Sequence, residues 1–340
     1  MAGVLPPFEF LAVVAEQSYG VPMGGFGSPT PIATLVASGQ AAWIRLAGAN
    51  RFGMRAVPTK RNIDFGGGFA SPGYSVAEQW GIAGALEVIP CYSQMAFLAG
   101  WALQPLNSGL TTPWTYSGSY AGDLASCTIY HGIMRSDTSI KRTAYYGCKV
   151  PTVKLSSSPT GTSLSLSLRA SSKQGLTYYA GGAPITTSDP SSSVFPAPAD
   201  TVFPTDELLF IQTLNNFTIG GLTLTFPLSM DINIDNKLDA LFFNSPFIIV
   251  DQKRGRTGTA ACKLLYTATP DWRADMEALT SRSASFAWSN GPHSVTIGFQ
   301  GNNLLDSLAD DLQPGRQYEQ TVTWKYQRDV AAGDIAVTVT

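Results

Sequence analysis

The residues best suited by type and position to binding or catalysis form one stretch of polar residues alternating with isoleucines, Asp231-Ile-Asn-Ile-Asp235-Asn236. An EF-hand loop also presents acids at alternate positions, but it needs a bidentate Glu at its twelfth position, where this chain has Phe242. The isoleucines instead continue an apolar alternation that begins at Leu222. Because side chains of a strand point alternately to its two faces, Asp231 and Asp235 are predicted to lie on a polar strand face.

Other catalytic and metal-binding patterns are missing from the sequence. The chain has two histidines, His131 and His293, and no H-x-x-H or C-x-x-C spacing. Residues 73–77 (Gly-Tyr-Ser-Val-Ala) fall short of a nucleophile elbow, because no helix is predicted after them. The glycines at 66–68 are not followed by the Lys-Ser/Thr of a phosphate-binding loop. We therefore predict a protein that is not an enzyme and that has no cofactor and no metal.

The densest group of positive charges is the stretch 251–258, which contains Lys253, Arg254 and Arg256. Such a hairpin loop is either simply solvated or, in an assembling protein, reaches carboxylates of a neighbouring subunit. Lys60 and Arg61 precede a glycine-rich loop that would be its equivalent earlier in the chain. All five cations are candidate inter-subunit contacts.

Composition excludes several classes of protein. The 340 residues include 22 Lys or Arg and 24 Asp or Glu, a net charge of −2, and only 14% are charged, against roughly 25% in ordinary domains. No basic surface for nucleic acid and no membrane span of about 20 apolar residues is predicted. The N-terminus makes a poor signal peptide, because it lacks a basic start and carries Glu9 and Glu16 in its apolar stretch. The four dispersed cysteines predict buried thiols; of these, Cys127 and Cys148 could lie on adjacent strands.

Strand signals dominate the elements that must position these residues. The alternation over 222–234 is interrupted by Pro227, which predicts an edge strand or a bulge. Shorter alternations lie at 164–168, 322–326 and 335–339. Two helices are predicted: one runs from Pro90 to about Gly100, and the other opens at Thr269-Pro270-Asp271 with an apolar stripe of Trp272, Met276 and Leu279. The fold class is therefore all-β with one short helix per domain.

A Pro/Ser-rich stretch divides the chain. We predict a first β domain over 1–180 with an N-terminal arm, a linker over 181–206, and a second β domain over 207–340. Four landmarks recur in the same order on both sides. These are a strand leading into a helix (from Gly81 and from Gly258), a strand (127–130 and 294–297), a Pro/Gly turn (159–161 and 314–315), and an alternating strand (from Leu164 and from Val322). This order predicts a duplicated domain.

Three short motifs resemble those of tail tube proteins of long-tailed bacteriophages. They are Glu16-Gln-Ser-Tyr-Gly-Val-Pro22; Tyr145-Tyr-Gly-Cys-Lys-Val150 followed by Leu164-Ser-Leu-Ser-Leu168; and Phe217-Thr-Ile-Gly220 with Met230-Asp-Ile-Asn-Ile-Asp-Asn236. The first departs from the family's E-x-x-Y-G-T-P pattern, since Val21 replaces Thr. The similarity extends thinly over most of the chain.

The resemblance implies two tandem β-sandwich or barrel domains whose sheets join around a ring. Rings would stack into a hollow virion tail tube that conducts DNA into the host. Single-domain members form hexamers, so a duplicated chain would make trimeric, pseudo-hexameric rings, with a hexamer as the alternative. Implied partners are the tape measure, terminator and baseplate proteins and, transiently, DNA. Synthesis would take place in the host cytoplasm, with no membrane insertion.

A channel for DNA needs walls that do not hold phosphates, so Asp231 and Asp235 are candidate lumen-facing acids. The alternative is that they face outward or pair with Arg254 or Arg256 of a neighbour. The 181–206 segment and residues 1–34 are further candidate contacts. A different class of function also stays open: a carbohydrate-binding or adhesion module, with Trp114, Tyr116 and Tyr120 stacking on sugars.

Overall fold

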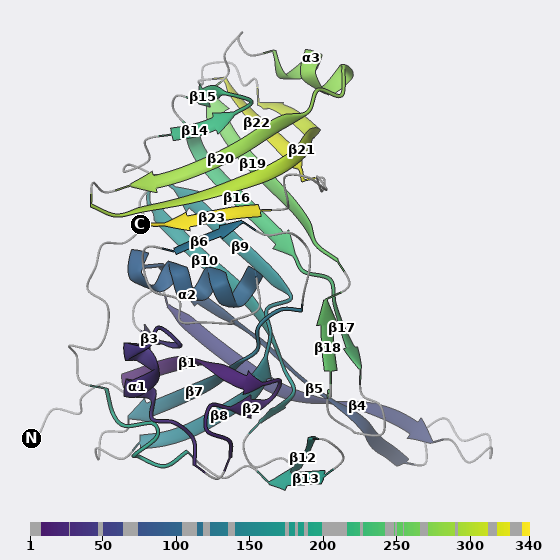
Figure 1. The fold of residues 1–340 in the computed structure, drawn as a ribbon. Helices are drawn as coiled ribbons and strands as arrows, with labels where there is room; N and C mark the ends of the chain where they lie inside the picture. Colours follow the sequence, from purple (N-terminus) through teal and green to yellow (C-terminus); the bar gives the residue numbers. More distant parts are fainter. Residues whose placement is uncertain are drawn as a thin grey trace, which may run out of the picture.

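The fold is described here from a computed structural model of the full chain. Its described residues are 8–26, 28–46, 50–63, 74–103, 114–117, 123–134, 140–173, 177–180, 183–186, 190–198, 216–224, 227–241, 248, 250–253, 255–265, 271–289, 292–311, 318–326 and 335–340. Strands dominate, accompanied by three short helices (Figure 1), which confirms the predicted fold class.

One sheet is built by both halves of the chain and is called the shared sheet. Its strand order is β4-β5-β10-β9-β16-β19-β22-β21, all antiparallel. The first four strands are β4 (Arg51–Ile63), β5 (Tyr74–Val88), β10 (Gly161–Ala170) and β9 (Thr152–Ser158). The last four are β16 (Pro227–Asp235), β19 (Thr257–Leu265), β22 (Glu319–Lys325) and residues 304–311 of β21 (Ser294–Asp311).

Each half adds an outer sheet of its own. The first outer sheet has β1 at its centre and contains β3 (Ala41–Leu46), β1 (Phe8–Ser18), β7 (Cys127–Met134), β8 (Ile140–Cys148), β11 (Ser172–Lys173) and the short β2 (Val21–Pro22). The second outer sheet contains β15 (Leu222–Leu224), β14 (Asn216–Ile219), β20 (Arg282–Ser289), residues 294–303 of β21, β23 (Ile335–Val339) and β6 (Trp114–Ser117). Two hairpins, β12/β13 (Thr177–Ala180, Ala183–Thr186) and β17/β18 (Leu238–Leu241, Val250–Lys253), stand apart.

The two halves follow the same path through space. In each, two strands of an outer sheet lead to two strands of the shared sheet, then to a helix, a hairpin of the outer sheet, a hairpin of the shared sheet and a last outer strand. By this order β7 corresponds to β20, whereas the landmark comparison matched 127–130 with 294–297, one strand too far along. The strand that leads into a helix and the alternating strand occupy corresponding places, whereas the turn at 314–315 lies outside the described residues.

The halves are joined edge to edge rather than by a spacer alone. Strand β9 of the first half pairs with β16 of the second from Thr152↔Asp235 to Ser157↔Met230. The predicted linker, 181–206, begins within the β12/β13 hairpin, and Phe195 is fully buried in an aromatic cluster on the first outer sheet with Phe10 and Trp43. The domain boundaries themselves remain a prediction.

The helices differ from expectation in three ways. Helix α2 (Tyr92–Leu103) extends three residues beyond Gly100, and α1 (Ile32–Ala37), six residues without a side-chain cap, was not predicted. Helix α3 (Trp272–Glu277) is capped by Asp271, whose carboxylate accepts from the backbone N–H groups of Arg273 and Ala274. Leu279 lies beyond α3 with a φ of 51° and is 69% exposed, so the predicted apolar stripe is wrong at its last member.

The 222–234 alternation is two strands rather than one. β15 belongs to the second outer sheet and β16 to the shared sheet. The bulge predicted at Pro227 is present between residues 227 and 229, but β16 is not an edge strand, because β9 and β19 flank it. Residues 8–18 of the predicted N-terminal arm are likewise β1, a strand between β3 and β7.

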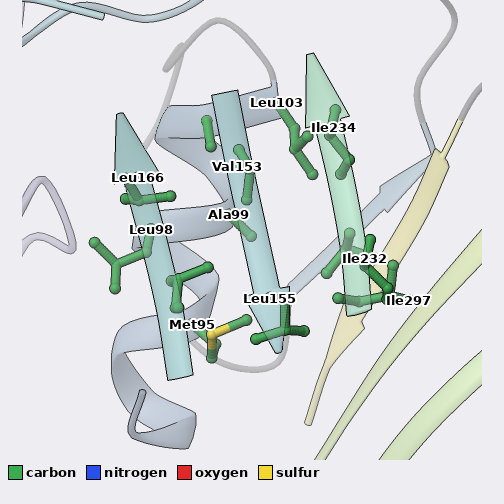
Figure 2. Close-up of a pocket in the computed structure, with 13 residues that line it drawn as sticks. Met95, Leu98, Ala99, Leu103, Val153, Leu155, Leu166, Ile232, Ile234 and Ile297 are labelled. Carbon is green, nitrogen blue, oxygen red and sulfur yellow. The ribbon is translucent and has the colours of Figure 1, made fainter. Parts of the chain in front are cut away.

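The core lies between the shared sheet and α2. A small apolar cavity of about 30 Å³ remains there, where the β9/β16 junction meets the helix (Figure 2). Figure 2 shows Met95 and Leu98 from α2 facing Val153 and Leu155 of one half and Ile232 of the other. A dry void of this size is a packing imperfection, too small to bind a substrate.

Candidate assembly and channel surfaces

One face of the shared sheet is apolar and packs on the core, and the other is polar. In β9, β10, β19 and β22 buried residues alternate strictly with more exposed ones. The polar face is rich in Ser and Thr and carries charges of both signs. Its described charged residues are Arg51, Arg55, Glu87, Lys154, Arg169, Asp231, Asp235, Lys263, Glu319 and Lys325.

Asp231 lies on this polar face, at the junction of the two halves. Its carboxylate accepts a hydrogen bond of 2.5 Å from the Ser156 hydroxyl and lies 3.9 Å from the Lys154 ammonium. Both partners come from β9, so the acid ties the halves together on the outside of the sheet. The ion pair is half exposed and therefore weak.

Asp235 lies four residues further along the same face and pairs within its own turn. Its carboxylate accepts from the backbone N–H of Lys237 at 2.9 Å and from the Lys237 ammonium at 2.5 Å. Partial burial opposes ionisation, but the hydrogen bonds and charge of Lys237 outweigh it and hold the pKa of Asp235 below its ordinary value. Whether these two acids face a lumen remains a prediction.

The expected contact cations lie on corresponding hairpins. Lys60 and Arg61 are in the outer part of β4, paired with Ala77 and Val76 of β5. Lys253 is the last residue of β18, paired with Leu238, and Arg254 lies outside the described residues. Both hairpins connect the first two shared-sheet strands of their half; in Figure 1 the β4/β5 hairpin extends to the right and the β17/β18 hairpin runs downward. The contact role of these four residues stays a prediction.

Arg256 is used inside its own chain. It is 9% exposed, and its guanidinium donates to the Asn236 side-chain oxygen at 2.9 Å and to the Leu103 carbonyl at 2.6 Å. Asn236, fully buried, donates to the carbonyls of Ala102 and Val150, each at 2.9 Å. The last carbonyls of α2, which have no partner within a helix, are thus satisfied by the second half.

Glu16 is a residue whose role sequence reasoning missed. It is partly buried, and its carboxylate accepts from the Gly20 N–H (2.8 Å), the Thr128 hydroxyl (2.8 Å) and the Gly147 N–H (2.7 Å). Burial raises the pKa of Glu16, and the hydrogen bonds only partly offset that effect. Two of the family-like motifs, at 16–22 and 145–150, therefore meet at one carboxylate.

The same contact explains the glycine in the second motif. Gly147 has a φ of 66°, and an added Cβ would lie 2.6 Å from that of Ser171. Beside it, the buried Lys149 pairs with Asp123 at 2.5 Å and lies over the Tyr19 ring at 5.0 Å. These motif residues hold β1, β7 and β8 together.

The remaining candidates have structural surroundings. His131 is largely buried in β7, which lowers its pKa, and lies 3.6 Å from Glu9. All four cysteines are free and buried, as predicted, and Cys127 and Cys148 are cross-strand partners. Trp114 and Tyr116 fall in β6, paired with β23, and Tyr120 lies outside the described residues.

Within the described residues no group of acids, histidines or cysteines could hold a metal. In the same part of the chain, no helix is both long and apolar enough to cross a bilayer.

A family model described as phage tail tube protein matches residues 9–325. The chain belongs to this family. A search of curated proteins found no significant match. As a phage tail tube protein, the chain is a structural component of the virion tail that assembles with other subunits and tail proteins into a tube. The polar face of the shared sheet, the hairpins and the sheet edges are the described surfaces that are available for contacts in such a tube.

Proposed function

We propose that three chains close into a pseudo-hexameric ring and that stacked rings form a hollow conduit for DNA ejection. The observation that carries this proposal is the strand order of the shared sheet. Its two end strands, β4 and residues 304–311 of β21, correspond to the two strands that join in its middle, β16 and β9. Each end strand has a single partner within the described part of this sheet.

Because the end strands correspond to β16 and β9, β4 of one chain can pair with residues 304–311 of β21 in the next chain as β16 pairs with β9 within one chain. Head-to-tail contacts of one kind close into a ring when the rotation per subunit fits, and three chains with two copies each give six similar units. Closure would also protect two exposed strand edges that otherwise invite aggregation. Six single chains per ring remain the alternative.

The polar face of the shared sheet would line the channel, with α2 and the outer sheets around it. Lys154 with Asp231, Lys237 with Asp235 and Lys263 with Glu319 neutralise one another on that face. These ion pairs, with serines and threonines between them, make a wall of mixed sign rather than a concentrated positive patch, on which DNA can slide. Tape measure, terminator and baseplate proteins would contact the tube inside and at its ends.

Negative-stain electron microscopy across a concentration series tests assembly. Hollow tubes with three chains per ring are expected, and dispersed monomers at every concentration would refute the ring. The channel is tested separately in phage carrying Asp231→Lys and Asp235→Lys together. Tubes that form normally but deliver DNA poorly are expected; unchanged delivery would exclude these acids from the wall.

A further inference from the structure

We propose that β4 of one chain pairs with residues 304–311 of β21 of the next in one defined register, with Gly53 opposite Asp311. Arg51 and Arg55 then lie on β4 two residues to either side of that pair. The proposal rests on the ring proposed above and specifies its junction. Figure 1 shows β4 and β21 near opposite ends of the sheet, as a head-to-tail contact requires.

The two edges carry opposite charge. On β4, Arg51 and Arg55 are exposed, whereas β21 exposes Asp306 and ends at Asp311; Asp310 is paired within its own chain with Arg273 and Gln320. Opposite charges on facing edges steer two surfaces together and help to fix their register.

The register follows from the junction already present within the chain. Leu166↔Leu86 and Val322↔Cys262 are corresponding pairs, and all four residues are fully buried. The residues paired with them on the neighbouring strands correspond as well. Phe52 of β4, opposite Leu86, corresponds to Met230 of β16, opposite Cys262. Val153 of β9, opposite Leu166, corresponds to Leu308 of β21, opposite Val322.

Transferring the β9/β16 pairs by this correspondence gives the pairs between chains. Asp231↔Ser156 becomes Gly53↔Asp311, and Asn233↔Lys154 becomes Arg55↔Ala309. An added Cβ at Gly53 would meet nothing within 4 Å, so a facing side chain has room there. Arg51 and Arg55 lie two residues to either side of Gly53 on the same face, at the positions diagonal to residue 311.

Both junctions then join an acid to a cation, but with the signs exchanged. Inside the chain the acid, Asp231, is on the first strand and the cation, Lys154, on the last. Between chains the cations are on β4 and the acid on β21. Pairing β9 with a second β4 would set Lys154 opposite Arg55, and pairing β21 with a second β16 would set Asp311 opposite Asp231. Like charges directly opposite disfavour both errors, so the correct alternation of halves is favoured, although one such pair, Asp311 with Glu319, is tolerated within the chain.

The β21 end also exposes apolar surface. Leu279, after α3, and Tyr318, before β22, are 69% and 54% exposed, and they are the exposed large apolar side chains of the described residues. The corresponding helix, α2, lies against β21 and β23 of the other half. A second copy docked on the β21 edge would cover this end in the same way, since exposed apolar groups gathered at one end mark an interaction surface.

Charge reversal tests the pairing in the full chain. Arg51→Asp with Arg55→Asp, or Asp311→Arg alone, should raise the concentration needed for assembly by roughly tenfold or more while the monomer stays folded. All three changes in one chain should restore assembly, without co-assembly with wild type. Arg45→Asp with Lys141→Asp, exposed cations of the first outer sheet, is the charge-matched control. Unchanged assembly of the Arg51/Arg55 variant would overturn the proposal.

Disulfide trapping tests the register. Arg55→Cys with Ala309→Cys should cross-link neighbouring chains roughly tenfold faster than Arg55→Cys with Ser307→Cys, because only opposed residues come within bonding range. Equal or faster linking by the second pair would overturn the register. Wild-type tubes without a 55–309 cross-link would refute this junction and leave the ring standing, whereas a wild-type chain that never assembles would refute both.

Discussion

The two halves of the chain use the same strand order but hold their helices differently. Helix α2, in the first half, is enclosed by the shared sheet and by strands of the second half, and its carbonyl end is satisfied by Asn236 and Arg256. Helix α3, in the second half, buries mainly Trp272 and is held by local contacts, the Asp271 cap and the Arg282–Asp275 ion pair at 2.6 Å.

This difference indicates that the first half is completed by its own chain, whereas the second half ends on an open side. The two helices occupy corresponding places in the fold. The one between the two halves, α2, is long and apolar, whereas α3, at the far end of the second half, is short and capped by Asp271. Leu279 and Tyr318 lie exposed at that end. We therefore expect substitutions on the enclosed side, around α2, to lower stability more than substitutions around α3.

The largest effect is expected from Trp101→Ala in α2. Trp101 is fully buried, and its indole N–H donates to the Cys148 carbonyl at 3.0 Å. Loss of the ring should lower the free energy of unfolding by about 3–5 kcal/mol, measured by urea denaturation of the monomer. Met276→Ala in α3 is the comparison and should cost about 1 kcal/mol. Equal losses would show that α3 is as well enclosed as α2.

Asn236→Ala should come next. It removes the amide that donates to the Ala102 and Val150 carbonyls, and it takes from the Arg256 guanidinium one of its acceptors, while the Leu103 carbonyl still accepts from that guanidinium. We expect a loss of about 2–4 kcal/mol in the same assay. Asn233→Ala, on the exposed face of the same strand, should change stability by less than about 0.5 kcal/mol. A small effect at Asn236 would argue that the second half does not anchor α2.

A pH-dependent effect is expected at Glu16. Its pKa is raised above 4.5, so the folded chain binds this proton more tightly than the unfolded chain. The resulting stability is complete below pH 4.5 and is lost as pH rises through the folded pKa. Thermal melts should therefore show wild type losing stability relative to Glu16→Gln over that range.

Thr128→Val sharpens the Glu16 experiment. It removes a hydrogen bond that favours the ionised carboxylate, so the loss of stability should extend to higher pH. Wild-type and Glu16→Gln curves that stay parallel from pH 4 to 8 would contradict this assignment.

The smallest effect, with opposite sign, is expected on the open side. Leu279 adopts a left-handed backbone conformation that suits glycine. Leu279→Gly should leave the monomer as stable or up to about 1 kcal/mol more stable, while weakening assembly through lost apolar contact. Melting temperature and the concentration needed for assembly separate the two results. Weaker folding with unchanged assembly would mean that the leucine serves its own chain.

Local patterns in the sequence predicted much of the fold. The alternation at 164–168 predicted β10 and residues 159–161 predicted the turn before it, and the buried positions of β16 were those of its apolar residues. The start of α3 was misjudged by one or two residues, because Pro270 suggested the first helical position while the Asp271 side chain is the actual cap. Helix α1 has neither a capping side chain nor enough length to leave a signal.

The buried polar residues were harder to foresee. Asn236 looked like one more polar residue of an alternating strand, yet its partners are 86 and 134 residues away. Arg256 was expected to reach a neighbour because it belongs to a basic stretch, and the structure gives its guanidinium partners inside the chain. A distant partner leaves no trace in local spacing, so neither assignment could be made from the sequence.

By itself the sequence determined which residues face inward on the alternating strands at 164–168, 230–234, 322–326 and 335–339, that the cysteines are buried, and that a helix follows the second shared-sheet strand of each half. These features depend on the two-residue period of a strand and on side chains within a few positions of one another. Only the tertiary structure decided that β9 joins β16, that β4 and residues 304–311 of β21 each have one partner within the described part of the shared sheet, and that α2 is enclosed by strands of the second half while α3 buries mainly Trp272. Strand partners are chosen by backbone hydrogen bonds and packing over long separations, which any alternating strand can offer to several others.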